Sequence, residues 1–159
     1  MSKAKDKTNV MRQLDQKKIQ YTPYTFETDG SLTGLDVAKL LGKDENAVFK
    51  TLVTQGKSKD HYVFVIPVVK ELNLKKASQA VGEKSIAMVK SKELLDLTGY
   101  IHGGCSPIGM KKFFTTSLDI SAKDLEKITF SAGKRGYQVE IATEDLKKII
   151  DFEFHDLCD

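Results

Sequence analysis

The hydrophobic residues of this chain recur with two different spacings, which are found in different segments. Apolar positions three or four residues apart predict helices, and this spacing covers the segments 8–18, 35–41, 74–81 and 91–99. Alternation of apolar with polar positions, or a short run of β-branched and aromatic residues, predicts strands instead. The predicted strands cover the segments 21–26, 47–54, 61–68, 85–89 and 113–118.

The C-terminal part of the chain continues this mixture. Ser121 followed by Asp124 resembles a capping box, and Thr143 is a candidate N-cap, so each predicts the start of a helix. Phe152 and Phe154 alternate with acidic residues. The predicted elements are a helix over 121–128, strands over 129–132 and 137–141 around the turn 133–136, a helix over 143–150 and a strand or docked extension over 151–157.

Hairpins and helices are interleaved along the whole chain, which predicts an α+β fold around a largely antiparallel sheet, with closure of that sheet into a barrel left open. The 159 residues contain no linker, repeat or low-complexity tract. Because this length suffices for one well-formed core, we expect a single domain over 1–159.

Composition narrows the class of protein further. The formal net charge is +3 and the pI is about 8.7, which is compatible with a polyanionic partner without requiring one. Two cysteines with no Cys-x-x-Cys spacing and no histidine cluster argue against a disulfide framework and against a metal site. The N-terminus lacks the apolar core of a signal peptide, and no run is long enough to span a membrane, so we expect a cytoplasmic protein.

Segment 100–112 concentrates glycine and proline. It contains Gly103, Gly104, Pro107 and Gly109 between segments of regular structure. Glycine permits positive φ and close approach of a ligand, while proline stiffens the loop, so the backbone N–H groups could line an anion pocket. A tight connection between two strands is the alternative.

Lys50 is the sharpest anomaly of the sequence. On the predicted strand it shares a face with Val48 and Leu52, while Phe49 and Val53 occupy the other face. An ammonium group is rarely buried without a partner, because its desolvation costs several kcal/mol. Lys50 therefore either extends to solvent from an edge strand or lines a polar cavity and binds an anionic or carbonyl ligand.

Further candidate site residues lie in or near turns, one of them alone and four as two pairs. Ser131 precedes the 133–136 turn and has no base at a recognisable spacing, so it is a better ligand-binding residue than a nucleophile. Lys134 and Arg135 are either solvated turn residues or phosphate contacts. His102 and Cys105 could meet as a thiol–imidazole pair, although a surface histidine and a small buried cysteine explain them more simply.

Ordered motifs along the chain resemble the YbaK-type aminoacyl-tRNA deacylases, which are relatives of the editing domain of bacterial prolyl-tRNA synthetase. The similarity extends over about 10–150. The motifs that carry it are Val48-Phe49-Lys50-Thr51-Leu52, Asn73-Leu74-Lys75-Lys76, Thr98-Gly99-Tyr100, Gly103-Gly104-Cys105-Ser106-Pro107-Ile108-Gly109 and Ser131-Ala132-Gly133-Lys134-Arg135-Gly136.

The resemblance implies a barrel-like mixed sheet surrounded by helices and hydrolysis of mischarged Cys-tRNA(Pro) in trans, without a cofactor or a metal. It implies that Lys50 is the essential residue and that the thiol of the substrate attacks its own ester. It also implies a substrate site for which our candidates are Gly103, Gly104, Ser106, Ser131, Phe26 and Gln138.

Two positions depart from the pattern of some relatives. Phe26 stands where these carry an aromatic hydroxyl, and Gln138 stands where they carry an aspartate. Lys134 and Arg135 are the candidate tRNA contacts, the 3′ aminoacylated end of tRNA is the expected partner, and prolyl-tRNA synthetase is a candidate second partner. Ala-tRNA(Pro) as substrate, or a non-catalytic tRNA- or synthetase-binding module, are the alternatives.

Overall fold

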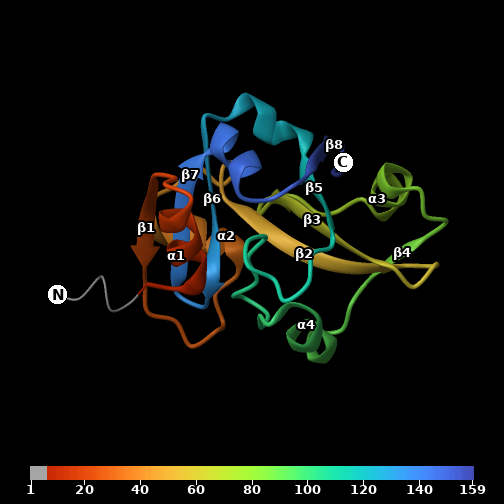
Figure 1. Ribbon diagram of the computed structural model, residues 1–159, viewed down its shortest axis with the longest axis horizontal. Coiled ribbons are helices and arrows are strands. Elements are labelled where there is room, and N and C mark those ends of the chain that lie inside the picture. The colour runs from red at the N-terminus through yellow and green to blue at the C-terminus, as the bar shows by residue number, and fades with distance from the viewer. Residues whose placement is uncertain (1–6) are drawn as a thin grey trace.

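Two β-sheets flanked by short helices make up the protein (Figure 1). The computed structural model describes residues 7–159. The α-helices are α1 (Asn9–Gln16), α2 (Gly34–Leu40), α3 (Leu74–Val81) and α4 (Ser91–Thr98), and the 3₁₀ helices are η2 (Ile120–Asp124) and η3 (Thr143–Lys148). The strands are β1 (Tyr21–Thr25), β2 (Phe49–Gly56), β3 (His61–Pro67), β4 (Ile86–Met88), β5 (Thr115–Asp119), β6 (Lys127–Lys134), β7 (Tyr137–Ala142) and β8 (Glu153–His155).

The larger sheet has the strand order β4-β2-β3-β5-β8, and the smaller has the order β1-β7-β6. All pairs of the smaller sheet are antiparallel, as are β2–β3 and β2–β4, whereas β3–β5 and β5–β8 are parallel. The α+β class with a mixed, largely antiparallel sheet is therefore confirmed. The strands form two sheets and not one closed barrel.

The two sheets meet at the start of β2. Val48 forms an isolated parallel bridge with Thr129 of β6, and the Thr129 amide donates to the Ala47 carbonyl at 2.9 Å. Side chains alternate between faces with a period of two, so residues two positions further along each segment lie on the same face as the bridge. Lys50 and Ser131 occupy these positions, and the seam between the sheets thus places them side by side.

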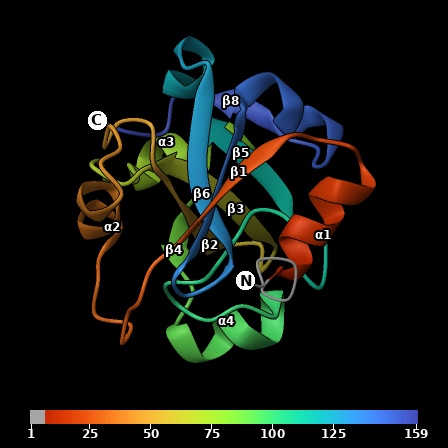
Figure 2. The same cartoon turned by 90° about the vertical axis from the view of Figure 1, so that its left-hand side faces the viewer.

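Local capping fixes the ends of two of the helices. Thr33 and Asp36 form a reciprocal capping box at the start of α2, and Asn73 caps α3, which ends at Gly82 with φ of 75°. Figure 2 shows α1 and α2 on either side of β1, β7 and β6. The larger core includes Leu14, Phe49, Phe130 and Ile141, and a smaller core under the large sheet contains Phe64, Ile66 and Leu157.

Two predicted helices were wrong. The segment predicted as a helix over 121–128 is a single 3₁₀ turn, because Asp119 accepts from the Ser121 amide at 3.2 Å and Ile128 already belongs to β6. In the segment predicted as a helix over 143–150, the residues Thr143–Lys148 form a 3₁₀ helix. Thr143 does not cap it: its hydroxyl donates to the Leu125 carbonyl at 2.7 Å. Each helix within residues 7–159 is too short or too polar to cross a bilayer.

Candidate functional site

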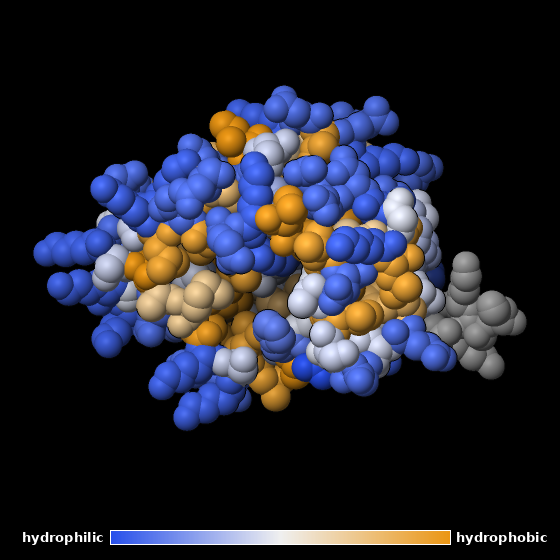
Figure 3. All heavy atoms as spheres, turned by 180° about the vertical axis from the view of Figure 1, so that it is seen from behind, coloured by the Kyte–Doolittle hydropathy of each residue, from blue (hydrophilic) through white to orange (hydrophobic). Residues whose placement is uncertain are grey.

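A cleft of about 190 Å³ lies at the seam between the two sheets. From behind, the molecule is hollowed near its centre, with apolar residues around the hollow and hydrophilic residues along the outline (Figure 3). The apolar part of the cleft lining includes Val37, Val48, Phe49 and Leu94. Gly103 contributes backbone to the lining. Polar side chains of the lining are those of Thr33, which caps α2, and of Lys50, Thr51, His102, Cys105, Ser131 and Gln138.

Lys50 is half-buried in this lining. It stands opposite Ile66 in the β2–β3 ladder, and its neighbours Val48 and Phe49 are each only 2% exposed. Its ammonium forms no salt bridge with any group of residues 7–159. A cation that lies on an apolar strand without a carboxylate partner is available to an anionic or carbonyl group of a ligand.

Ser131 and Gln138 face each other across the β6–β7 hairpin. The Ser131 hydroxyl accepts a hydrogen bond from the Gly133 amide at 3.1 Å, within a register shift of β6. Gly133 has φ of 94°, a conformation that glycine adopts without strain. The bulge therefore ends regular pairing beside the cleft and fixes the Ser131 side chain, as bulges near binding sites commonly do.

Two residues of the cleft lining each hold a buried side-chain oxygen without a hydrogen-bond partner. These oxygens are Thr51 Oγ1 and Gln138 Oε1, and within residues 7–159 every other buried side-chain polar atom has a partner. A buried polar group without a partner costs about 1–3 kcal/mol, and such groups are rare in native proteins. Since Thr51 and Gln138 both line the cleft that Lys50 also lines, their hydrogen-bonding capacity is available to a ligand that reaches these oxygens with hydrogen-bond donors.

Sequence reasoning missed Thr51 as a site residue. The signal was present, because Thr51 directly follows Lys50 in the motif Val48-Phe49-Lys50-Thr51-Leu52. Strand alternation assigned it to the face opposite Lys50, whereas both residues line the cleft at the seam. His102 and Phe49 are further lining residues that were not proposed as ligand contacts.

The glycine-rich loop forms one wall of the cleft. Gly103 has φ of 88°, and its neighbour Gly104 packs so closely on the β6–β7 turn that an added Cβ would lie 3.1 Å from the Arg135 amide nitrogen. The Gly104 amide donates to the Ile101 carbonyl at 2.9 Å. The loop is thus held against the hairpin, with Gly103 at the mouth of the cleft.

Five predicted site residues lie outside the cleft lining, and their assigned roles stay predictions. Ser106 is fully buried and its hydroxyl accepts from the Ile108 amide at 3.3 Å, while Gly104 is buried against the hairpin. Phe26 is half-buried and its amide donates to the Gly136 carbonyl at 2.9 Å. Lys134 and Arg135 are exposed at the hairpin turn, where the Lys134 ammonium lies 5.0 Å from the Tyr137 ring centroid.

His102 and Cys105 both line the cleft, but the thiol is poorly suited to act as a nucleophile. Burial raises the pKa of Cys105 to about 12. A thiol acts as a nucleophile through its thiolate, and a group with this pKa is protonated at neutral pH. The structure therefore favours Cys105 as a small buried filler of the loop.

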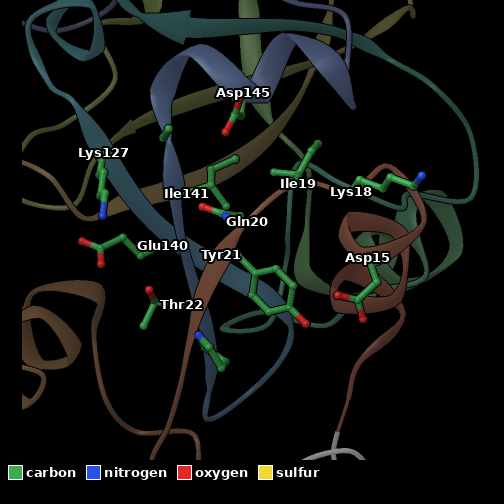
Figure 4. A pocket seen from close by; sticks show the side chains of 12 residues that line it. Asp15, Lys18, Ile19, Gln20, Tyr21, Thr22, Lys127, Glu140, Ile141 and Asp145 are labelled. Carbon is green, nitrogen blue, oxygen red and sulfur yellow. The ribbon is translucent and has the colours of Figure 1, made fainter.

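A larger hollow lies elsewhere. It is an open groove of about 710 Å³ between α1, β1, β7 and η3 (Figure 4). Its acidic side chains already have partners: Asp15 pairs with Lys7 at 2.6 Å, Glu140 with Lys43 at 3.2 Å and Asp145 with Lys148 at 2.7 Å. Its lysines Lys18 and Lys127 have no salt-bridge partner within residues 7–159, but they are exposed to solvent, whereas Lys50 is half-buried on an apolar strand. Hydrated lysines and paired carboxylates in an open groove need no ligand, so the smaller cleft is the candidate site.

The fold, the cleft and the sequence motifs together define the class of protein to which this chain belongs. The chain belongs to the aminoacyl-tRNA editing domain family, whose model matches residues 30–149. The resemblance drawn from the sequence motifs is thereby confirmed.

Particular relatives refine this class. The chain is 44% identical over 156 residues to EbsC of Enterococcus faecalis, a protein provisionally named Cys-tRNA(Pro)/Cys-tRNA(Cys) deacylase, with 98% of this chain and 95% of EbsC covered. A solved structure described provisionally as a trans-editing enzyme for prolyl tRNA synthetase superposes with a TM-score of 0.80 at 19% identity, covering 96% and 98% of the two chains. The hypothetical protein APE2540 superposes with a TM-score of 0.85 at 21% identity, covering 96% and 100%. These two structures support the fold.

Proposed function

We propose that this protein deacylates mischarged Cys-tRNA(Pro) in trans, with the seam cleft as its active site. The observation that carries the proposal is that one cleft is lined by Lys50, which has no salt-bridge partner within residues 7–159, and by Thr51 and Gln138, which each hold a buried oxygen without a hydrogen-bond partner. The 44% identity to EbsC, which is provisionally named for this substrate, supports the choice of aminoacyl group.

The dimensions of the cleft fit the end of a charged tRNA and not its helical stem. At about 190 Å³ it is smaller than the roughly 300–1,000 Å³ typical of pockets that enclose a drug-sized ligand. We place the cysteinyl group inside, with its ammonium donating to Gln138 Oε1 and Thr51 Oγ1. Lys50 then holds the ester carbonyl or the 3′-terminal adenosine, and the Gly103 amide supports the developing oxyanion.

The substrate supplies the nucleophile in this proposal. Its thiolate attacks the ester carbonyl, a C–S bond forms, and the C–O bond to the ribose breaks as the ribose oxygen takes a proton. The resulting cyclic thioester is then hydrolysed by water to free cysteine. Positioning and charge stabilisation are the tasks left to the protein, which matches a cleft whose only thiol, Cys105, has a pKa raised by burial to about 12.

Release of amino acid from purified Cys-tRNA(Pro), Ser-tRNA(Pro), Ala-tRNA(Pro) and Pro-tRNA(Pro) tests the proposal. Cysteine and serine differ by one atom, and steric discrimination at that scale is only about 1–3 kcal/mol. We expect Cys-tRNA(Pro) to react far faster than the others, with a rate that rises with pH toward a thiol pKa of roughly 8.5. Equal rates on cysteinyl and seryl substrates with a flat pH profile would contradict thiol participation, and preferential release of alanine would reassign the substrate.

Prolyl-tRNA synthetase is the partner that we propose for delivery of the mischarged tRNA. The test is co-elution of the two proteins in gel filtration, with and without tRNA(Pro). A complex that forms only with tRNA present would identify the tRNA as the bridge, and independent elution in both cases would contradict the partnership.

A further inference from the structure

Arg135 connects the β6–β7 turn to the glycine-rich loop. Its Nε donates a hydrogen bond to the His102 carbonyl at 2.9 Å, across 33 positions of sequence. This carbonyl belongs to the peptide unit that joins His102 to Gly103, and both residues line the cleft. The guanidinium therefore acts on the backbone of the site and not on its side chains.

The chain leaves room for this guanidinium at two glycines. An added Cβ would lie 2.8 Å from Arg135 Nη1 at Gly30 and 3.3 Å from Arg135 Nε at Gly103. Both glycines have positive φ, of 93° and 88°. A side chain at either position would strain the backbone and displace the guanidinium, so Gly30, Gly103 and Arg135 form one slot, which we call the arginine slot.

The hydrogen bond has a directional consequence for Gly103. In a trans peptide the C=O and the following N–H point in opposite directions, so holding the His102 carbonyl toward Arg135 directs the Gly103 N–H away from it. That N–H forms no hydrogen bond within residues 7–159. The positively charged guanidinium that donates to this carbonyl oxygen also polarises the peptide and strengthens its N–H as a donor.

We propose that Arg135 is a positioning residue that fixes the His102–Gly103 peptide so that the Gly103 N–H meets the carbonyl oxygen of the substrate. This role rests on the proposed function of the cleft, and it replaces a phosphate contact as the task of Arg135. It predicts that Arg135 affects the chemical step, whereas a phosphate contact would affect binding of tRNA.

The test compares Arg135→Gln and Arg135→Lys with Lys57→Gln, which removes the same charge at the far end of β2. We expect Arg135→Gln to lower kcat about ten- to a hundredfold while KM changes less than about threefold, because misplaced oxyanion donors cost rate and not ground-state binding. Arg135→Lys retains the charge but not the planar fork, so it restores less than half of the loss on a logarithmic scale. Lys57→Gln leaves both constants near those of the wild type.

A second readout does not require activity. In Arg135→Gln the ¹⁵N relaxation order parameter of Gly103 should fall, and exchange of the Gly104 amide, which is bonded to the Ile101 carbonyl, should accelerate, with no such change in Lys57→Gln. If the wild type releases no amino acid, the proposed function fails while this measurement still tests the slot. If Arg135→Gln melts below the assay temperature, Arg135→Lys carries both measurements.

The result that would overturn the proposal is a rise in KM, or in Kd for uncharged tRNA, with unchanged kcat and unchanged loop dynamics. Full recovery of activity in Arg135→Lys would likewise identify Arg135 as a phosphate contact, since an ammonium supplies that charge equally well.

Discussion

Two buried polar clusters of this protein differ in how completely their hydrogen bonds are satisfied. Asp119, which is 3% exposed at the end of β5, accepts from the Leu157 amide at 3.0 Å, the Ser121 amide at 3.2 Å and the Ser121 hydroxyl at 2.6 Å. Its carboxylate thereby ties the C-terminal segment to the 3₁₀ turn η2. Every donor that it needs comes from the chain itself.

The seam cleft shows the opposite state. Thr51 Oγ1 and Gln138 Oε1 are buried without partners, and Lys50 has no counter-ion within residues 7–159. A protein retains such groups at a cost in stability only where another molecule completes them. Burial of polar groups alone therefore does not mark a binding site. Buried polar groups without hydrogen-bond partners, gathered among the residues that line one cleft, indicate a binding site.

Lys50→Ala should give the largest effect. Loss of this cation, the only lysine or arginine of residues 7–159 in the cleft lining, should reduce deacylation of Cys-tRNA(Pro) at least about a hundredfold, the magnitude typical of removing one electrostatic stabiliser. Thermal melting should be unchanged or slightly raised, because a desolvated charge is relieved. Activity within tenfold of the wild type, or a collapsed melting temperature, would contradict the role of Lys50.

Asp119→Ala should have the converse effect. It leaves the buried Leu157 amide and the part-buried Ser121 amide without their acceptor, so the free energy of unfolding should fall by about 3 kcal/mol. Urea denaturation measures this loss. At a temperature where the variant is folded, its kcat should match the wild type, and a selective loss of kcat would show that the two clusters are not separate.

Gln138→Leu and Thr51→Val replace the open oxygens by apolar groups of similar shape. Stability should be unchanged or rise by up to about 1 kcal/mol, because no partner is lost, while kcat/KM should fall about tenfold through lost hydrogen bonds to the substrate. Melting and deacylation are measured on the same preparations. A destabilisation of several kcal/mol with normal activity would mean that these oxygens serve the fold.

Cys105→Ala should have the smallest effect on the reaction, with a rate within about threefold of the wild type, because the protein thiol takes no part. The substitution should instead change how the free energy of unfolding depends on pH in the alkaline range. The folded pKa of Cys105 is raised from 9.0 to about 12, so the folded state holds this proton more tightly. The contribution is present in full below pH 9 and is lost as pH rises from 9 toward 12.

The alkaline titration provides the check on this assignment. Between pH 9 and 11 the stability of Cys105→Ala should decline less steeply than that of the wild type. Cys158, whose pKa is also raised to about 12 by burial, keeps a residual slope in both proteins. Identical slopes would contradict the raised pKa of Cys105.

Local signals made much of the fold predictable. Helix α3 has the predicted bounds 74–81, because the Asn73 side chain caps its start and Gly82 with positive φ ends it, so both ends are determined locally. The 3₁₀ turn η2 was not predictable in this way. Asp119 competes with Ser121 as the capping residue, and strand pairing of Ile128 with Ile141 decides where the turn must stop.

The site was predictable in part for the same reason. Lys50 and Ser131 stand out from their own neighbours in sequence, whereas the seam that joins them depends on the single bridge between Val48 and Thr129. That Thr51 and Gln138 each hold a buried oxygen without a hydrogen-bond partner can be seen only once both sheets are packed. A sequence shows which residues are unusual, and long-range pairing determines which of them share a cleft.

The most direct measurement of the central claim is a titration of the ¹⁵N-labelled protein with cysteine joined through an amide to 3′-amino-3′-deoxyadenosine, a non-hydrolysable form of the charged tRNA end. We expect the NMR signals of the Thr51 and Gly103 amides and of the Gln138 side-chain amide to shift on binding, and we expect Lys50→Ala to weaken the interaction. Shifts confined to the open groove at Tyr21, Glu140 and Asp145, with the cleft unperturbed, would contradict this claim.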